Sequence, residues 1–273
     1  MPEIAFRNIR AFYDSWGEGR PLLLLHAGSS SSSQWKKVGE YLSKDRRLIA
    51  PDCIGFGGTE SWPEPGALTH DLQAELVAQV LKSEAVEQID IVGHSYGGAS
   101  AVRLFLRCPQ KVRSLVLIEP IMSWLLKDAG DPLYEDSVRV AKFFIGCADS
   151  GRNEEGWEAF LDCRNGAGTW SRLSDKARAR FLSSTRNTKE GFISNLNNHT
   201  SLRDCRSINV QTTIVCGAET TAPDRRTTEL LKDVISDAAY HVIPGAAHMS
   251  PFTHPAEVAH IITTHLQQRK RGN

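Results

Sequence analysis

One stretch, residues 88–98 (QIDIVGHSYGG), limits what this chain can fold into more than any other. Residues 89–92 are a mainly apolar run typical of a buried strand, and residues 99–106 continue in a helical pattern. Between them, Gly-x-Ser-x-Gly at residues 93–97 predicts a turn so tight that neither glycine can carry a side chain. Such a turn strains the backbone at Ser95 and lifts its hydroxyl to the N-terminal end of the helix, where amides favour an anion. The strand, the turn and the helix together make Ser95 a candidate nucleophile.

The rest of the chain alternates between apolar runs and helical patterns. A short antiparallel edge hairpin is expected at the start, over residues 4–6 and 9–15. Buried strands are then expected at residues 21–25, 48–50, 89–92, 112–118, 212–216 and 240–243. Helical patterns lie between or after them at residues 34–42, 68–82, 99–106, 226–234 and 255–268. This order predicts an α/β fold: a mainly parallel, eight-stranded sheet flanked by helices.

The alternation stops between residues 121 and 206. This segment has no strand-like run, but it has helical stretches at 138–144, 155–161 and 175–182. It also contains three of the six tryptophans and five of the ten phenylalanines. We expect a core domain of residues 1–120 and 207–273, with a helical cap inserted at 121–206. Its aromatic side chains are expected either to line an apolar substrate pocket or to form the small core of the insertion itself.

Composition excludes several classes of protein. The chain has 273 residues, of which 41% are hydrophobic, and its formal net charge is zero, so nothing draws it to nucleic acid or to an anionic membrane. Its six cysteines are scattered without zinc-binding spacing, which is typical of reduced thiols. No signal peptide and no membrane-span-length apolar run is recognisable. We expect a cytoplasmic monomer or homodimer that needs no metal or organic cofactor, with the basic run Arg269-Lys270-Arg271 as a solvated helix end.

Four motifs, in order along the chain, resemble those of the α/β-hydrolase superfamily. They are His26-Ala27-Gly28 followed by Trp35, Asp52-x-x-Gly55-x-Gly57, the Gly-x-Ser-x-Gly stretch, and Pro244-Gly245-Ala246-Ala247-His248-Met249. The resemblance covers nearly the whole predicted core. It implies a serine hydrolase, esterase-like and with a helical cap, in which a nucleophile elbow, a catalytic triad and an oxyanion hole lie at the carboxyl edge of the sheet. A fold of this kind hosts many reactions, so it does not determine the substrate.

Within this resemblance, Ser95 is the nucleophile and His248 the base that activates it. His248 follows a strand and a glycine-containing loop near the end of the chain. Of the other histidines in this region, His241 lies inside the last expected strand. His254, His260 and His265 lie on or beside the last helix and are expected to face solvent.

The acid of the triad does not follow the common pattern. Relatives commonly place an aspartate three residues after the glycine that ends the seventh strand, and here that glycine is Gly217 and the position is Thr220. Glu219 and Asp224 are nearby but out of register. Glu119 directly follows the strand after the nucleophile's helix, where certain haloalkane dehalogenases carry their acid, and a charge at the end of a buried strand needs a partner. Glu119 is therefore the leading candidate, with Glu219, Asp224 and the lack of any acid left open.

Two backbone amides complete the expected site. By register with the superfamily, the oxyanion of a tetrahedral intermediate would be held by the amides of Tyr96 and Gly28. His26 and Asp52 are expected to hold loop backbone and to take no part in the chemistry.

The leading functional hypothesis is hydrolysis of carboxylic esters through an acyl-enzyme, with small to medium hydrophobic substrates. Haloalkane dehalogenases and epoxide hydrolases use aspartate where Ser95 stands, which disfavours both. Meta-cleavage C–C hydrolases share the serine triad but usually carry asparagine before the serine, where this chain has His94. A proline iminopeptidase needs acidic residues in the insertion to hold a free amine. Four acidic residues of the insertion leave that possibility open: Asp149, Glu154, Glu155 and Glu158. A ligand receptor of the same fold with little turnover is the remaining alternative.

Overall fold

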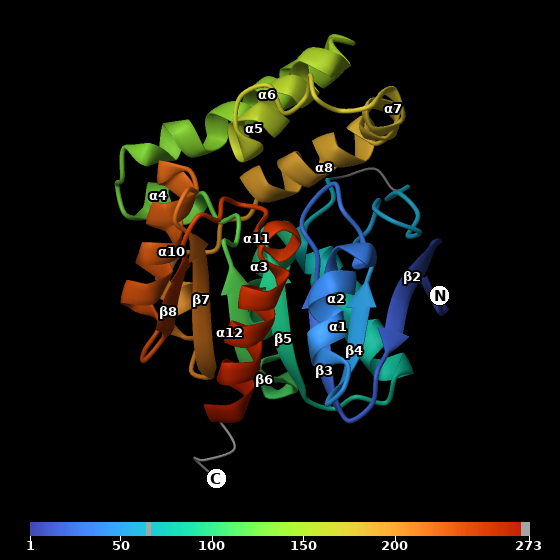
Figure 1. Cartoon of the computed structure of the whole chain (residues 1–273), viewed down its shortest axis with the longest axis vertical. Helices are drawn as coiled ribbons and strands as arrows, with labels where there is room; N and C mark the ends of the chain where they lie inside the picture. Colours follow the sequence, from blue (N-terminus) through green and yellow to red (C-terminus); the bar gives the residue numbers. More distant parts are fainter. Residues whose placement is uncertain (64–66, 269–273) are drawn as a thin grey trace.

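The computed structural model describes residues 1–63 and 67–268, so the expected basic helix end at 269–271 lies outside the described residues (Figure 1). Its centre is one eight-stranded sheet with the order β1-β2-β4-β3-β5-β6-β7-β8. The strands are β1 (Glu3–Phe6), β2 (Ile9–Trp16), β3 (Arg20–Leu25), β4 (Arg46–Pro51), β5 (Ile89–His94), β6 (Val112–Ile118), β7 (Gln211–Gly217) and β8 (Ala239–Ile243). The pairs β1–β2 and β2–β4 are antiparallel and the others parallel, which confirms the predicted fold class.

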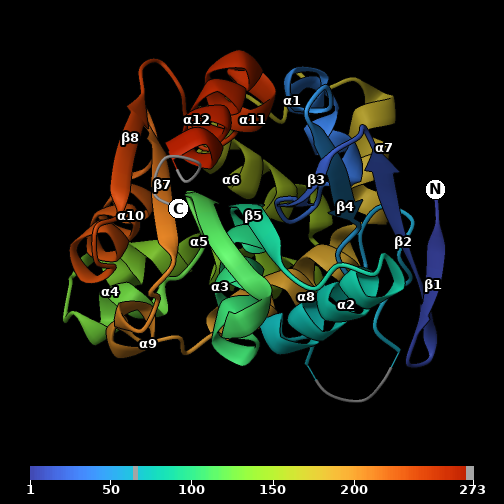
Figure 2. The same ribbon diagram turned by 90° about the horizontal axis from the view of Figure 1, so that it is seen from below.

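Helices cover both faces of the sheet (Figures 1 and 2). Leu22 and Leu24 of β3 point to the face covered by α1 (Lys36–Leu42) and α12 (Pro255–Gln268). Leu23 and Leu25 point to the opposite face, which is covered by α2 (His70–Ser83), α3 (Tyr96–Arg107) and α10 (Ala222–Val234). All four leucines are nearly inaccessible to solvent. A strand buried on both faces is apolar at every position, and this is why the central strands were recognisable as continuous runs.

The segment between β6 and β7 is helical throughout its regular structure, and every residue of it is described. Its helices are α4 (Trp124–Asp128), α5 (Leu133–Asp149), α6 (Asn153–Asn165), α7 (Asp175–Ser183), α8 (Thr185–Leu196) and α9 (Leu202–Arg206). We call α4–α9 the helical insertion. Its helices α5–α8 lie together beyond the carboxyl ends of the parallel strands, at the top of the view in Figure 1. The sequence predicted parts of α5, α6 and α7 but not α4, α8 or α9.

The insertion has an aromatic core of its own. Phe144, Trp157 and Trp170 are buried together, and partly buried phenylalanines pack against them, namely Phe160, Phe181 and Phe192. Phe144 and Trp157 meet edge to face with ring centroids 5.1 Å apart. The expectation that these aromatic residues form a core is therefore confirmed.

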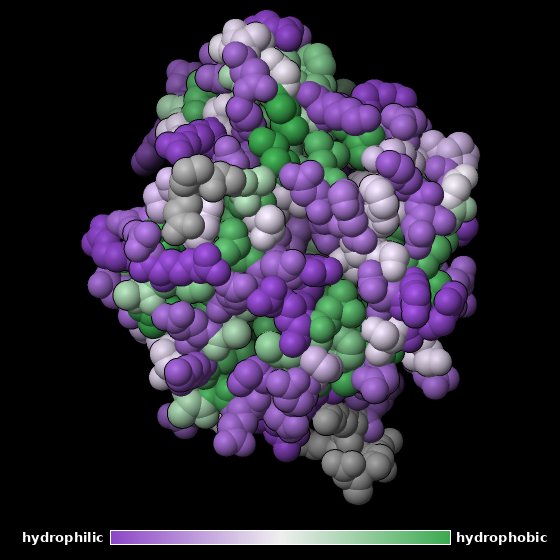
Figure 3. Space-filling view, turned by 180° about the vertical axis from the view of Figure 1, so that it is seen from behind, coloured by the Kyte–Doolittle hydropathy of each residue, from purple (hydrophilic) through white to green (hydrophobic). Residues whose placement is uncertain are grey.

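The surface is mostly hydrophilic on the face shown in Figure 3, where hydrophobic residues appear in separate areas between polar ones. Within the two described ranges, no helix combines the length and the apolar character that crossing a membrane requires.

Candidate active site

Ser95 lies in the turn between β5 and α3, at the carboxyl edge of the sheet. Its backbone has φ 55° and ψ −116°, a conformation that is strained for any residue with a side chain. Four backbone hydrogen bonds hold it there: its amide donates to the Ile118 carbonyl at 2.9 Å, and its carbonyl accepts from Gly98 at 3.0 Å, Ala99 at 3.1 Å and Ile121 at 3.2 Å. These bonds connect the turn to the elements on both sides of it. The positive φ confirms the predicted backbone strain at Ser95.

The glycines of the turn are there because other backbone occupies the space of a side chain. A Cβ on Gly97 would lie 2.4 Å from the Leu25 carbonyl oxygen, and one on Gly93 would lie 2.7 Å from the Gly97 oxygen. Neither contact can be relieved by rotating a side chain, because the facing atoms belong to the backbone of β3 and of the turn itself.

We expect Gly97→Ala to lower the free energy of unfolding by about 2–4 kcal/mol, because the backbone of β3 or of the turn must move. Gly146→Ala is the matched control: no atom lies within 4 Å of a Cβ added at this exposed position of α5. Alanine there should raise stability by about 0.5–1 kcal/mol, since glycine is a poor helix former. Urea unfolding of both variants measures the difference, and equal stabilities would contradict the tight turn.

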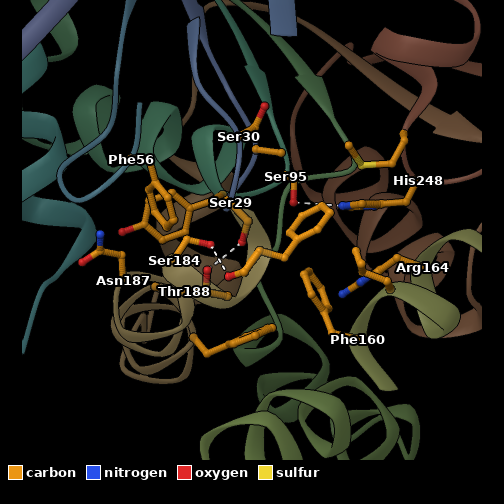
Figure 4. Close-up of a pocket in the computed structure, with 18 of the residues that line it drawn as sticks. Ser29, Ser30, Phe56, Ser95, Phe160, Arg164, Ser184, Asn187, Thr188 and His248 are labelled. Carbon is orange, nitrogen blue, oxygen red and sulfur yellow. Dashed lines mark hydrogen bonds between the residues drawn. The ribbon is translucent and has the colours of Figure 1, made fainter. Parts of the chain in front are cut away.

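His248 follows β8 and is buried beside Ser95. Its Nε2 lies 2.9 Å from the Ser95 Oγ, and its Nδ1 lies 2.7 Å from the Glu119 Oε2 (Figure 4 shows the first contact). A carboxylate can only accept, so Nδ1 carries the proton and donates it to Glu119. Nε2 is then unprotonated and accepts from the Ser95 hydroxyl, which is the arrangement a general base requires.

Glu119 comes directly after β6, with a positive φ of 40°, and its side chain is buried. Its Oε1 accepts from the Gly217 amide at 2.6 Å, and its Oε2 accepts from the Thr220 hydroxyl at 2.7 Å as well as from His248. Burial alone would raise the pKa of this carboxyl, but the His248 contact and these hydrogen bonds lower the pKa to about 2. Thr220, which stands where relatives commonly have aspartate, is thus a hydrogen-bond donor to the carboxylate.

The other two candidate acids are placed differently. Glu219 is exposed, and the part of it that bonds across the site is its backbone amide, which donates to the Ala246 carbonyl. Asp224 is buried in the first turn of α10, and its Oδ2 lies 3.8 Å from the His248 Nδ1. Asp224 forms an ion pair with Arg164 of α6. Arg164 is the residue that sequence reasoning missed, because one arginine on an amphipathic helix gives no signal of its own.

Glu119, Asp224 and His248 form a compact cluster, with one potential metal-ligand atom of each within 4.8 Å of the others. Each of these atoms already has a protein partner, and the guanidinium of Arg164 supplies the positive charge that two neighbouring carboxylates need. The donor set therefore fits an ion-pair network better than a metal site.

Buried histidines around the site are held neutral. Burial lowers the pKa of His248, as does the charge of Arg164, while Glu119 opposes both. Burial also lowers the pKa of His94 to about 3, and the His94 Nε2 donates to the His248 carbonyl at 2.8 Å. The pKa of His70, on α2, is lowered to about 4, again mainly by burial.

These shifts predict how stability depends on pH. Unfolded histidine takes up a proton near pH 6.5, whereas the buried histidines His70, His94 and His248 resist protonation until lower pH. The unfolded state therefore binds more protons below about pH 6.5, and the free energy of unfolding should fall as the pH is lowered from 6.5 towards 4. Urea unfolding at several pH values tests this. His70→Gln should show a shallower slope against pH, and a wild-type stability that is flat over this window would contradict the prediction.

The expected oxyanion donors lie together beside Ser95. Gly28 is in the loop after β3, and a Cβ built on it would be 3.7 Å from the Tyr96 Cβ. Both residues line the same cavity as Ser95 and His248. Their two amides stay the predicted donors of an oxyanion hole.

His26 and Asp52 hold the loops at this edge, as expected. The His26 Nδ1 donates to the Ala27 carbonyl at 2.7 Å and its Nε2 accepts from the Cys53 amide at 2.9 Å. Asp52 accepts from the Ser32 amide at 2.6 Å and from the Gly58 amide at 2.8 Å.

One expectation about the histidines is wrong. His260 is exposed, but His265 is buried, with its Nδ1 2.8 Å from the Thr213 hydroxyl of β7. The reason is the helical period: Val258, Ile261 and Ile262 face the sheet, and position 265 lies on the same face of α12. That spacing was visible in the sequence and would have identified His265 as a buried residue.

The cavity above Ser95 has a volume of about 830 Å³ and lies between the core and the helical insertion. Phe160 and Arg164 approach the Ser95–His248 pair, while Ser29 and Thr188 lie on another side, with hydroxyls 3.0 Å apart (Figure 4). Phenylalanines of the insertion's core also line the cavity, so the same side chains take part in both the core and the cavity wall.

The charged residues that line the cavity are all basic. They are Arg164, Lys176 and Arg180, and among the described residues the lining includes no aspartate or glutamate. Four acidic residues of the insertion were the candidates for binding a free amine. None of them is part of this lining: Asp149, Glu154, Glu155 and Glu158. The electrostatic character of the cavity therefore suits an anion better than a free amine.

Comparison with known proteins agrees with this fold. The family model of the alpha/beta hydrolase fold matches residues 20–255. The chain is 27% identical over 272 residues to a 2-hydroxymuconate semialdehyde hydrolase of Pseudomonas sp. (strain CF600), covering 97% of this chain and 93% of that protein. It is 24% identical over 266 residues to a proline iminopeptidase of Heyndrickxia coagulans, covering 92% and 91%.

Among solved structures, the chain is similar to MGS-M2, an alpha/beta hydrolase enzyme from a Medee basin deep-sea metagenome library. The TM-score is 0.83 at 17% sequence identity, and the match covers 97% of each chain, so it supports the fold alone. Because the family model spans most of the chain and the structure has the corresponding sheet and nucleophile turn, the chain belongs to the alpha/beta hydrolase family.

Proposed function

We propose that this protein is a serine hydrolase in which Ser95 attacks a substrate carbonyl, His248 moves the proton and Glu119 orients the histidine. The observation that carries the proposal is the hydrogen-bonded chain from the Ser95 Oγ through His248 to Glu119, which opens onto the cavity. A free serine hydroxyl is a poor nucleophile, and a neutral imidazole at 2.9 Å provides the base that it needs.

The reaction proceeds in two halves. The His248 Nε2 takes the hydroxyl proton as the Ser95 Oγ bonds to the carbonyl carbon, and the amides of Gly28 and Tyr96 hold the resulting oxyanion. The leaving group takes the proton from the imidazolium, and an acyl-enzyme remains. Water then attacks the acyl carbon while His248 takes its proton. The bond to the Ser95 oxygen breaks, His248 returns the proton to that oxygen, and the carboxylic acid leaves. In this scheme residues 1–120 and 207–273 are the core domain, and residues 121–206 are the cap that covers the bound substrate.

The cavity supports a substrate with an anionic group and an apolar part. Three basic side chains line it, and phenylalanines of the insertion form part of its wall. One of the relatives that span nearly the whole chain is named for 2-hydroxymuconate semialdehyde, which carries a carboxylate. We therefore propose C–C bond hydrolysis of a carboxylate-bearing dienoate of this class. The bond between the attacked carbonyl carbon and the dienoate fragment breaks, and its electron pair stays on the carbon of the fragment. That fragment carbon takes up the proton held by His248, while the carbonyl carbon remains on Ser95 as the acyl group.

A carboxylic ester is the second candidate substrate, and His94 favours it. C–C hydrolases of this fold usually carry asparagine before the serine. Here the His94 side chain is buried, bonds to the His248 carbonyl and is not part of the cavity lining. A polar side chain at this position therefore does not reach the substrate. The aminopeptidase alternative is less well supported, because the cavity lining would present an amine with basic side chains and no carboxylate.

Parallel assays distinguish the two substrates. If the C–C proposal holds, kcat/KM for 2-hydroxymuconate semialdehyde exceeds that for p-nitrophenyl butyrate. If the ester proposal holds instead, kcat/KM is higher for p-nitrophenyl butyrate. In either case mono-p-nitrophenyl succinate should be preferred to the neutral butyrate by about tenfold or more, since a charged hydrogen bond is worth about 1.5–3 kcal/mol. The combined variant Lys176→Gln/Arg180→Gln should reduce that preference. A preference for neutral or cationic esters would contradict an anion-binding cavity.

A further inference from the structure

A buried ion pair joins the helical insertion to the core directly beside His248. Arg164 comes from α6 of the insertion, and Asp224 from the first turn of α10 in the core. Their side chains are 15% and 10% exposed. Removing either partner would leave the other charge buried without its counterpart, so the pair is not an incidental surface contact.

Two carboxylates therefore face a single N–H group. The His248 Nδ1 lies 2.7 Å from Glu119 and 3.8 Å from the Asp224 Oδ2. Nδ1 has one proton and can donate it to only one of them. Hydrogen bonds from the Gly217 amide and the Thr220 hydroxyl direct the Glu119 carboxylate towards Nδ1. The same Asp224 oxygen that approaches Nδ1 is bonded by Arg164 and by the Thr221 hydroxyl at 2.8 Å.

We propose that Arg164 is a positioning residue that directs the His248 proton to Glu119, by holding Asp224 in an ion pair and cancelling its charge. Without Arg164, Asp224 is a second orienting acid for the same histidine. Because Arg164 belongs to the insertion, the proposed cap contributes to the arrangement of the catalytic groups as well as to the shape of the cavity. This inference rests on the proposed serine mechanism.

The charged and titratable groups that face His248 come from four elements. Glu119 follows β6, Asp224 lies on α10, Arg164 on α6, and His94 ends β5. His94 is neutral above its pKa of about 3, and its Nε2–H is committed to the His248 carbonyl. The charge around the imidazole is therefore set by two carboxylates and one guanidinium. Removing the guanidinium favours the imidazolium, and removing the Asp224 charge disfavours it.

The first experiment is a rescue, measured as kcat on the substrate that wild type turns over best. Glu119→Gln alone should lose about 10³–10⁴-fold, as expected when an orienting acid is removed. Adding Arg164→Gln should restore at least about tenfold of that loss, because Asp224 then accepts from Nδ1. The further change Asp224→Asn should remove the gain. Glu119→Gln combined with Arg164→Lys should show no rescue, because lysine keeps the charge that neutralises Asp224.

The second experiment needs no turnover. NMR titration of the His248 imidazole in otherwise intact protein should show its pKa rising in Arg164→Gln and falling in Asp224→Asn. Arg226→Gln is the control, since Arg226 on α10 also pairs with the insertion, through Asp131 at 2.8 Å, but lies outside the cavity lining. It should leave the titration unchanged. An ion pair whose charges do not act on the imidazole would not shift the His248 pKa in opposite directions in the two variants.

Shifts of the same sign in the two variants, or shifts no larger than that of Arg226→Gln, would overturn the inference. So would a Glu119→Gln/Arg164→Gln protein that is folded and no faster than Glu119→Gln. The titration separates this result from failure of the proposed function. If Ser95 is not the nucleophile, the predicted order of kcat values among these variants fails, while the opposite shifts of the His248 pKa remain.

Discussion

Replacing Ser95 by alanine should lower kcat by about 10⁵–10⁶-fold while leaving the fold intact, as is found when a serine nucleophile is deleted from a comparable triad. The Ser95 Oγ is the atom that faces the His248 Nε2 at 2.9 Å. The strained turn itself is held by backbone hydrogen bonds and by the packing of its glycines, none of which involves the hydroxyl. Steady-state kinetics on the preferred substrate, together with the thermal midpoint, measures the two effects separately.

Ser30→Ala provides the matched control. Ser30 lines the same cavity (Figure 4), and its described hydrogen bond is made by the backbone, from its amide to the Ala27 carbonyl. Its replacement should change kcat by less than about tenfold, because no hydrogen bond joins its hydroxyl to a base within the described part of the chain. A Ser95→Ala protein with substantial turnover, or an equal loss in both variants, would assign the nucleophile to a different residue.

The second large effect is expected at Glu119. Glu119→Gln should lower kcat by about 10³–10⁴-fold, because the amide keeps the size of the side chain but removes the charge that stabilises the imidazolium of His248. The carboxylate is fully charged at neutral pH, since its pKa is lowered to about 2. Its hydrogen bonds from Gly217 and Thr220 fix the direction in which it accepts.

Glu219→Gln is the control for this prediction. Glu219 is adjacent to Thr220, carries the same charge and is exposed, so its replacement should leave kcat within about twofold of wild type. A pH–rate profile adds a second measurement: in Glu119→Gln the acidic limb should move to lower pH, because the imidazolium has lost its buried partner. If Glu219→Gln is the damaging change, Glu119 is not the orienting acid.

The central sheet was predictable because its physical signal is local. The second halves of β3 and β6, residues 22–25 and 115–118, are apolar at every position. A strand, a glycine turn and a helix in succession describe the Ser95 turn without reference to other segments. Helix α8 was not predictable in this way. Its sequence, TRNTKEGFISNL, is rich in polar and poor helix-forming residues, and it is helical because Thr188, Gly191 and Ser194 pack against the core and the rest of the insertion.

The candidate site likewise contains residues with a local sequence signal and residues without one. Ser95 and His248 occur in motifs that are contiguous in sequence, and Glu119 could be inferred because a charge at the end of a buried strand needs a partner. The Arg164–Asp224 pair could not be inferred, because its two residues are 60 positions apart and meet only when the insertion folds over the core. The absence of acidic groups from the cavity lining is likewise a property of the folded insertion and not of its composition.

The most direct test of the proposed mechanism is covalent labelling of Ser95 by a fluorophosphonate, followed by mass spectrometry of the intact protein and of its peptides. Such a reagent reacts with a serine only when a neighbouring base activates it, and it requires no knowledge of the substrate. We predict one adduct per chain, on Ser95, absent in Ser95→Ala, formed much more slowly in Glu119→Gln and unchanged in rate in Ser30→Ala. An unlabelled wild-type protein, or an adduct that persists in Ser95→Ala, would contradict the serine mechanism.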